Sequence, residues 1–357
     1  MTTILYYLLV IFALTFIILI HEIGHFIVAR RTGMKVERFG IGMGPTIYKK
    51  TINGVEYCIC AVPIGGFCQI KGEEEASTDT DSYDAKPPGK KFAVAVAGSL
   101  SNIILAFLIL ILTFSIFGVP NIKTQVDKIV PNSPAEIAGL KIGDEITGVN
   151  DVISEDWNIL RNEIAKNPGN SINLTVLREE KELKLAVIPE KDDKDSGIIG
   201  VYIAGKTYFN KISFLDSVKT AFMRLVLFFK DFSTFFGLLI TGKLSKLQVA
   251  GPLGIITMAK DSISVGVGYF LFFMALLSLN LGLVNLFPVP PLDGGKIIFA
   301  GIEGIFKRKV NKNVEMVINM VGFVLLISLL LFITWNDILR TGVVNKIMLF
   351  FGKLLHR

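Results

Sequence analysis

The sequence ILIHEIGHFIVARR, residues 18–31, sets two histidines and a glutamate in a run of apolar residues. His21 and His25 are four residues apart, so on a helix both imidazoles lie on one face, about 5.4 Å apart along the axis. This spacing lets both side chains reach one metal ion, and Glu22 is suited to deprotonate a water at that metal. Ionisable groups in a membrane span are costly, so they indicate function by default.

The composition is that of an integral membrane protein. The 357 residues are 51% hydrophobic and the mean hydropathy is +0.56, which excludes one large soluble core. The net charge of +6 is spread over loops beside apolar runs, as membrane topology requires. These basic residues are not interleaved with aromatic residues as in a nucleic-acid groove. We therefore expect the lipid bilayer, and no nucleic acid, among the partners.

Four apolar segments are long enough to cross a bilayer, since a spanning helix needs about 20 residues. The first carries the two histidines and ends at Arg30 and Arg31, as spans do at a cytoplasmic boundary. The third runs into NLFPVPPLDGG, residues 285–295, whose prolines end a helix. The predicted spans are residues 1–31, 92–118, 264–295 and 314–338, and a tail follows at 339–357.

The segment 32–91 is rich in Lys and Arg and is predicted to be a cytoplasmic loop. A turn-forming cluster at 39–45 precedes a strand-like stretch at 55–62, which indicates a β-hairpin. This hairpin either dips into the membrane beside the metal, which we favour, or lies on the surface. In the first case an edge strand of the hairpin at 55–70 could pair with an extended peptide. Residues 73–89 are acidic and rich in Ser, Thr and Pro, so we expect a mobile tether.

The segment 121–207 has a mixed, charged composition with alternating apolar positions, which predicts a small soluble α/β domain. Within it we predict a helix at 156–166 and strands at 172–177, 183–188 and 197–201. The segment 212–243 is apolar and aromatic but carries charges along its length. This pattern favours an amphipathic helix at the membrane interface, with a fifth span as the alternative.

The short basic loops predict the orientation in the membrane. The loop 32–91 and the segment 296–312 hold these loops, so both are expected in the cytoplasm. Four spans then leave the N-terminus, the domain at 121–207 and the C-terminus outside. In this arrangement His21, Asn102 and Asp293 converge in depth near the cytoplasmic leaflet.

A catalytic zinc ion usually has three protein ligands and a water. No further histidine lies near the first two, because the third one, His356, is close to the end of the chain. Asp293 is the only acidic residue between Asp261 and Glu303, and it follows an apolar span. We therefore predict one zinc ion bound by His21, His25 and Asp293, with Glu22 as the general base.

The HEIGH sequence, the pair Gly98 and Asn102, and the motif at 285–294 together resemble the site-2 protease family of intramembrane zinc metalloproteases. The sequence SPAEIAGLKIGDEI, residues 133–146, resembles the PDZ domains of bacterial membrane and envelope proteases. One such domain between the second and third spans is similar to the bacterial branch that performs regulated intramembrane proteolysis, although its better-known envelope member has two. The predicted fold is therefore a mainly α membrane protein with four transmembrane helices, a cytoplasmic-side β-hairpin region and one inserted extracytoplasmic α/β PDZ-like domain.

The resemblance implies a zinc metalloendopeptidase in the bacterial cytoplasmic (inner) membrane, with its active site toward the cytoplasmic leaflet. It also implies cleavage within or near the transmembrane segment of single-span partners, either anti-sigma factors or remnant signal peptides. The PDZ-like domain either binds a cleaved C-terminus or excludes substrates with bulky outer domains.

Two asparagines are candidates for substrate binding. Asn102 and Asn285 are expected to hydrogen-bond an unwound substrate or the developing oxyanion, with hydrogen bonds between helices as the alternative.

A non-proteolytic zinc-binding scaffold that binds proteins through its PDZ-like domain is the alternative function, but a purely structural site needs no base such as Glu22. A metal transporter would need a polar pathway, and the outer halves of these spans are too apolar to supply one.

Overall fold

The computed structural model describes residues 2–73, 75–122, 124–192, 195–203, 207–241 and 251–341. The predicted tail at 339–357 lies outside these residues from position 342 onward. The chain forms two compact units, one made of Met1–Thr113 with Val218–Arg357 and the other of Phe114–Ser217. Each unit is described by itself below.

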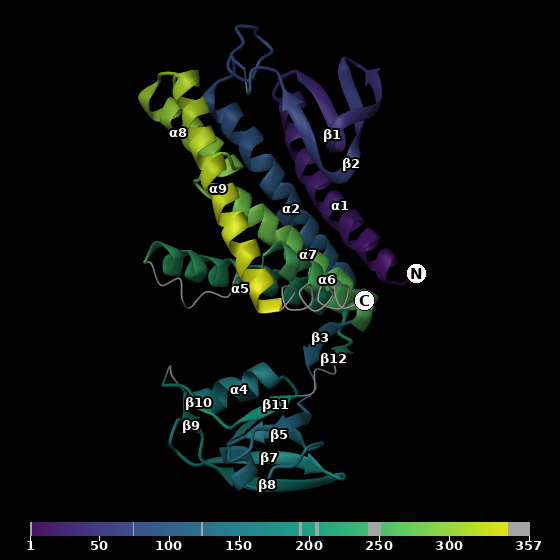
Figure 1. The fold of residues 1–357 in the computed structure, drawn as a ribbon, viewed down its shortest axis with the longest axis vertical. Coiled ribbons are helices and arrows are strands. Elements are labelled where there is room, and N and C mark those ends of the chain that lie inside the picture. Colours follow the sequence, from purple (N-terminus) through teal and green to yellow (C-terminus); the bar gives the residue numbers. More distant parts are fainter. Residues whose placement is uncertain are drawn as a thin grey trace, which may run out of the picture. The chain divides into compact units, whose positions relative to one another are not determined.

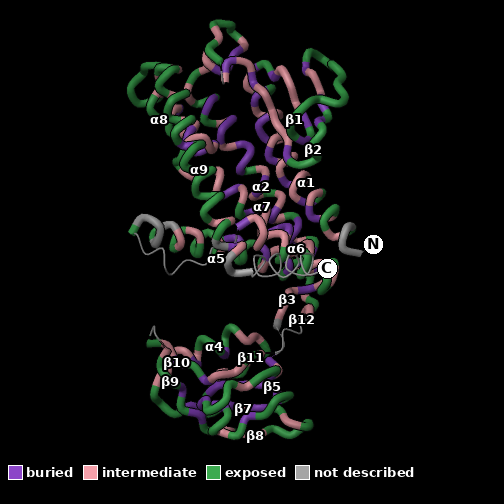
Figure 2. Tube along the Cα trace, in the orientation of Figure 1, coloured by how far each residue is buried: buried purple, intermediate pink, exposed green. Residues whose placement is uncertain are grey.

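The first unit is mostly helical and contains four helices long and apolar enough to cross a membrane among the described residues. These are α1 (Thr2–Arg31), α2 (Pro88–Ile116), α7 (Val267–Asn285) and α9 (Lys312–Thr341), which lie side by side in Figure 1. The predicted mainly helical fold with four candidate spans is confirmed. Buried residues are more frequent along α2 and α7 than along α9, which is largely exposed (Figure 2).

Glycines allow α1, α2 and α7 to approach one another closely. A Cβ atom added at Gly24 of α1 would overlap the backbone carbonyl of Ala97 in α2. A Cβ atom added at Gly282 of α7 would lie 2.9 Å from the carbonyl oxygen of Ser99 in α2. Such small residues permit the tight helix contacts seen in membrane proteins. They hold α2 against both of its neighbours at the depth of the histidines.

The two strands β1 (Val36–Ile52) and β2 (Val55–Ile70) form a long bent hairpin that packs on α1. Its turn is Asn53-Gly54, both with positive φ, which suits a two-residue hairpin turn. Phe39 pairs with both Cys68 and Tyr57, so the two strands make four sheet segments in the order 66–70, 36–41, 56–59 and 48–52. The cluster at 39–45, which was predicted to form a turn, is instead part of β1.

Residues 73–89 were expected to behave as a mobile tether, but part of this segment packs against the base of the hairpin. Tyr83 and Ser82 are buried, with exposed fractions of 6% and 0%. The N–H of Lys35 donates to the carbonyl of Asp81 at 2.8 Å, and the N–H of Tyr83 donates to the carbonyl of Lys71 at 2.7 Å. Tyr83 is the aromatic residue in this otherwise polar segment, and it packs in the core of Met34, Val36, Val55 and Ile70.

Three further helices lie in the part of this unit that the structure describes. They are α5 (Phe214–Ile240), α6 (Pro252–Val265) and α8 (Asp293–Phe306). The α5 helix falls within the segment 212–243 and is not one of the four candidate spans. The segment 296–312 was expected to be a basic loop, but α8 extends to Phe306. The spacing of Ile298, Ile302 and Ile305 on α8 is the helical signal that was missed.

The α6 helix begins at a contact with α9. Gly251 caps its N-terminus and Pro252 is the first helical residue, where a missing N–H costs nothing. The N–H of Gly254 donates to Oδ2 of Asp337 in α9 at 3.0 Å. A Cβ atom at Gly251 would lie only 2.6 Å from the same oxygen. The glycines in this stretch therefore let the start of α6 fit against a buried carboxylate.

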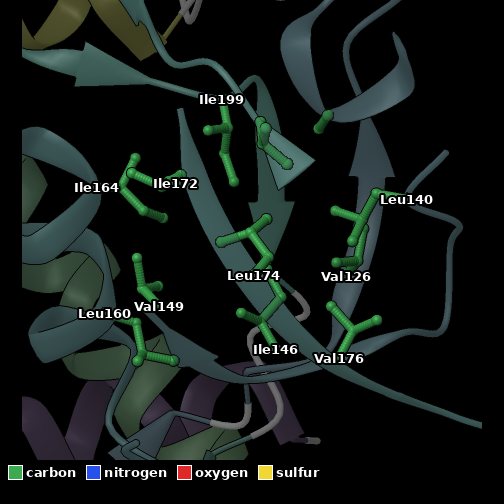
Figure 3. Packing of buried hydrophobic residues seen from close by; sticks show 12 residues of the cluster. Val126, Leu140, Ile146, Val149, Leu160, Ile164, Ile172, Leu174, Val176 and Ile199 are labelled. Atoms are coloured by element: carbon green, nitrogen blue, oxygen red, sulfur yellow. The ribbon is translucent and has the colours of Figure 1, made fainter. Parts of the chain in front are cut away.

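The second unit, Phe114–Ser217, is a small α/β domain with its own hydrophobic core. An antiparallel sheet in the order β6–β5–β7–β8 packs with α4 around Ile146, Leu160 and Leu174 (Figure 3). The helices are α3 (Pro134–Ile137) and α4 (Trp157–Ala165). The strands are β3 (Val119–Ile122), β4 (Val126–Ile129), β5 (Glu145–Val149), β6 (Val152–Ile153), β7 (Ile172–Arg178), β8 (Lys181–Val187), β9 (Glu190–Lys191), β10 (Gly197–Ile198), β11 (Val201–Ile203) and β12 (Thr207–Asn210).

Most of the predicted elements in this domain are confirmed. The side chain of Asp156 caps α4 by accepting from the N–H of Asn158 at 2.8 Å, which fits the helix predicted at 156–166. The strands predicted at 172–177 and 183–188 correspond to β7 and β8. The single strand predicted at 197–201 is wrong, because Gly200 adopts a φ of +76° and separates β10 from β11.

Candidate active site

His21 and His25 lie on the same face of α1 and are both buried, with exposed fractions of 6% and 7%. Their Nε2 atoms are 3.2 Å apart. Nδ1 of His25 lies 2.8 Å from the carbonyl oxygen of Val94 in α2. That hydrogen bond requires the proton on Nδ1, so the lone pair of Nε2 is free to bind a metal.

Asp293 reaches the histidines from the first residue of α8. Its Oδ2 atom lies 3.0 Å from Nε2 of His21 and 3.2 Å from Nε2 of His25. The chain turns back sharply before this point. A Cβ atom at Gly294 would overlap the carbonyl of Phe287, two residues beyond the end of α7. The glycine after Asp293 is thus needed to bring the carboxylate to the histidines.

These three side chains form the one group among the described residues with the donor atoms and spacing of a metal site. Two imidazole nitrogens and a carboxylate oxygen are the donors that zinc prefers. Zinc–ligand bonds of about 2.0 Å in a tetrahedron separate neighbouring ligands by about 3.3 Å. The observed separations of 3.0 to 3.2 Å match that value, so the residues fit a zinc ion.

Gly98 of α2 forms the wall behind the imidazoles. A Cβ atom at this position would collide with Nε2 of His25 and would lie 2.8 Å from Cε1 of His21. The sequence pointed to Gly98 only as part of the motif, with Asn102, that resembles the site-2 protease family. Its contact with two histidines more than 70 residues away was not predictable from any local pattern.

Glu22 is partly buried and lines a cavity of about 420 Å³. The cavity wall includes Gly66, Phe67 and Cys68 of β2, together with residues of α8 and α9. A Cβ atom at Gly66 would be 3.6 Å from Cγ of Glu22, so the hairpin lies directly beside the glutamate. A carboxylate next to a metal group and open to a cavity can take a proton from a water.

The structure brings one of the two predicted asparagines to the metal group. Nδ2 of Asn285, at the end of α7, lies 3.3 Å from Nε2 of His21. Asn102 is one turn beyond Gly98 on α2, and its side-chain amide is fully buried with no hydrogen-bond partner among the described residues. Its backbone carbonyl accepts from the hydroxyl of Ser278 in α7 at 2.9 Å. Asn102 therefore has an unused amide one turn from Gly98, with no hydrogen bond to the histidines.

Comparison with known proteins gives matches over nearly the whole chain. The sequence profile of Peptidase family M50 matches residues 9–329. The protein named "Putative zinc metalloprotease CPE1693" in Clostridium perfringens is 33% identical over 338 residues, which cover 94% of this chain and 99% of that protein. Zinc metalloprotease RasP of Geobacillus kaustophilus is 28% identical over 404 aligned positions, covering 90% of this chain and 95% of RasP.

Among solved structures, the PDZ domain of an SdrC-like protein from Listeria monocytogenes aligns with 22% of this chain and 85% of its own, at 18% identity and a TM-score of 0.21. A score this low supports no conclusion about the fold of the matching segment. The family match does not depend on it, since the profile covers the HEIGH sequence, Asp293 and both asparagines. This chain belongs to peptidase family M50, the site-2 proteases, and is a zinc metalloprotease.

Proposed function

We propose that this protease hydrolyses a peptide bond within or near the transmembrane segment of single-span substrates, as in regulated intramembrane proteolysis. The observation that carries the proposal is the position of the metal group on a candidate span. His21 lies nine residues before Arg30, or roughly 14 Å along α1. Anti-sigma factors and remnant signal peptides are the substrate classes that we propose.

We assign His21, His25 and Asp293 as the zinc ligands and Glu22 as the general base. When bound, zinc supplies a Lewis acid that activates the attacking water and polarises the scissile carbonyl. Glu22 accepts a proton from the water as the water oxygen bonds to the carbonyl carbon. It then delivers that proton to the amide nitrogen as the C–N bond breaks. The cavity beside Glu22 supports this role because it leaves room for a water.

Asn285 and Asn102 are proposed to bind the substrate backbone or the oxyanion. The 3.3 Å contact between Asn285 and His21 supports this role for Asn285. Asn102 is supported differently, because an amide without a partner among the described residues is costly to bury unless it acquires one. The alternative function for Asn102 is hydrogen bonding between helices. It is not supported, because the Asn102 side chain has no hydrogen-bond partner among the described residues.

A substrate helix must unwind before hydrolysis, because its carbonyls are hydrogen-bonded within the helix. Pairing of the unwound substrate with the hairpin would replace those bonds. The sequence pointed to the hairpin at 55–70 without specifying which of its edges pairs. Within this hairpin, the segment 56–59 already pairs with 38–41 on one side and with 48–52 on the other. Among the residues that the structure describes, the segment 66–70 pairs with 36–41 alone, and it borders the cavity of Glu22. We therefore propose 66–70 as the substrate-binding edge.

We further propose that the active site faces the cytoplasmic leaflet of the inner membrane and that the domain Phe114–Ser217 is PDZ-like and extracytoplasmic. The basic residues at the end of α1 and around 307–312 support this orientation. The charges along α5 support a location at the membrane interface.

The test is cleavage of a model single-span substrate in detergent by wild type and by Glu22→Gln, with zinc measured in both proteins. We expect equal zinc content and cleavage by wild type alone, because the glutamine cannot accept a proton. Cleavage by zinc-loaded Glu22→Gln would remove Glu22 from the mechanism. Absence of cleavage by both proteins over several single-span substrates would favour the scaffold function.

A further inference from the structure

The ammonium group of Lys296 lies beside the oxygen of Asp293 that faces away from the histidines. Oδ2 of Asp293 is the atom within 3.2 Å of both imidazole nitrogens. Oδ1 lies 3.7 Å from Nζ of Lys296, which is one turn further along α8. The two oxygens of this carboxylate are therefore distinguished by their neighbours, one by the metal group and the other by a cation.

Glu73 holds Lys296 in this position. Nζ of Lys296 donates to Oε1 of Glu73 at 2.7 Å, and the Glu73 side chain is only 14% exposed. The backbone carbonyl of Glu73 accepts in turn from Nζ of Lys312 at the start of α9, at 2.6 Å. Glu73 follows the end of β2 by three residues. The contacts thus connect the hairpin, α8 and α9 to the outer oxygen of Asp293.

We propose that Lys296, fixed by Glu73, positions the Asp293 carboxylate for zinc. This inference rests on the proposed role of Asp293 as a zinc ligand. A carboxylate can rotate and present either oxygen, or both, to a metal. A cation held at Oδ1 favours the orientation in which Oδ2 alone faces the histidines, and such outer contacts commonly orient metal ligands. Lys296 acts through Asp293 and is therefore a positioning residue.

The competing explanation is that the Lys296–Glu73 ion pair only fastens α8 to its surroundings. The same helix offers a matched control. Nζ of Lys91 in α2 lies 2.7 Å from Oε2 of Glu303 in α8, and both side chains are nearly buried. Glu303 is ten residues beyond Asp293, or about 15 Å along the helix. This second pair fastens α8 at the same distance between charges but far from the carboxylate ligand.

The experiment compares zinc affinity in the full chain, purified in detergent and titrated against a zinc chelator. The double variant Lys296→Met/Glu73→Gln removes the first pair without leaving a buried charge. Lys91→Met/Glu303→Gln removes the control pair in the same way. Lys296→Arg is a conservative variant that keeps a cation at position 296. Cobalt-substituted protein gives a second readout, since the visible absorption of Co²⁺ reports the geometry of its ligands.

We expect the Lys296→Met/Glu73→Gln variant to bind zinc about 10- to 100-fold more weakly and to show an altered cobalt spectrum. The Lys91→Met/Glu303→Gln variant should keep the wild-type affinity and spectrum, and Lys296→Arg should keep most of the affinity. Unchanged affinity and spectrum in the first variant, or equal losses in both double variants, would overturn the inference. Loss of the site itself is seen separately: if Asp293→Ala binds zinc like wild type, Asp293 is not a ligand and both proposals fail.

Discussion

The two histidines fit beside α2 because Gly98 has only a hydrogen atom in place of a side chain. A methyl group at this position would occupy the space of His25 Nε2 and crowd His21. We expect Gly98→Ala to lower zinc content well below one equivalent, because the imidazoles must leave their shared position. Zinc analysis of the purified protein is the measurement.

Gly89→Ala, near the start of the same helix, is the control for Gly98→Ala. A Cβ atom at Gly89 meets no atom within 4 Å, so this variant should keep its zinc. Full zinc content in Gly98→Ala would show that the histidines adjust to the methyl group, and would remove the steric role from this glycine.

The residues of the site differ in how far the sequence could reveal them. His21, Glu22 and His25 follow from spacing on one helix, and Asp293 follows from its isolation after an apolar span. The contacts of Gly98 and Lys296 were not predictable in this way. Each depends on which atoms of distant helices meet, and neither a glycine in an apolar span nor a lysine after a glycine pair has a pattern of its own.

At the scale of elements, the hairpin edge at 66–70 makes a testable claim about the substrate. A strand pairs with an exposed edge through backbone hydrogen bonds, which brings its side chains to regular spacings along that edge. In a variant without the native cysteines, we expect Gly66→Cys and Gln69→Cys to form disulfides with single cysteines placed in a model substrate. Tyr57→Cys, in the segment paired on both sides, should form none. Cross-links from Tyr57→Cys alone would contradict substrate pairing at 66–70.

An ion pair in the second unit predicts a pH dependence. The Asp144 carboxylate accepts from Nε and Nη2 of Arg178, each at 2.7 Å, and from the N–H of Lys141 at 2.8 Å. Burial alone would raise the pKa of Asp144, but these hydrogen bonds outweigh it and hold the pKa below its ordinary value. The ionised Asp144 carboxylate therefore contributes its full stabilisation above the pKa of the unfolded state, near 3.9. This stabilisation disappears as the pH falls through the lower pKa of the folded state.

We expect Asp144→Asn to lower the free energy of unfolding by about 2 kcal/mol at pH 7, since hydrogen bonds to a charged group are lost. The difference from wild type should shrink below about pH 4. Urea unfolding of the fragment 114–217 over this range measures it, with the exposed Asp151→Asn as the control. A difference that stays constant down to pH 2 would mean that the charge of Asp144 is not its source.

The elements were more predictable than the connections between them. Apolar length predicted α1, α2, α7 and α9, because bilayer thickness imposes it on the sequence. The start of α8 was harder to predict, since Pro288, Pro290 and Pro291 end one helix without indicating where the next begins. The split between β10 and β11 depends on the φ angle of Gly200, and a glycine in a strand-like stretch is compatible with either outcome.

At the scale of the whole molecule, the proposed function requires one orientation in the membrane. Because the domain 114–217 is inserted between the second and third candidate spans, we expect it on the side of the membrane opposite the loop 32–87. We expect the connection between α8 and α9, residues 307–311, on the same side as that loop, because α7 is the one candidate span among the described residues between the domain and this connection. Basic residues gather on this shared side, which predicts that it is cytoplasmic.

Labelling of single cysteines with a membrane-impermeant maleimide tests this orientation in cells whose cytoplasmic membrane is accessible and intact. In a variant without native cysteines, Asp151→Cys in the domain should react at once. Thr78→Cys and Lys309→Cys, which are also exposed, should react only after the membrane is permeabilised. The reverse labelling pattern would indicate that the metal group faces the outer leaflet. Zinc binding and peptide hydrolysis would survive that result, since they depend on local contacts alone, but the proposed cleavage of substrates near the cytoplasmic face would not.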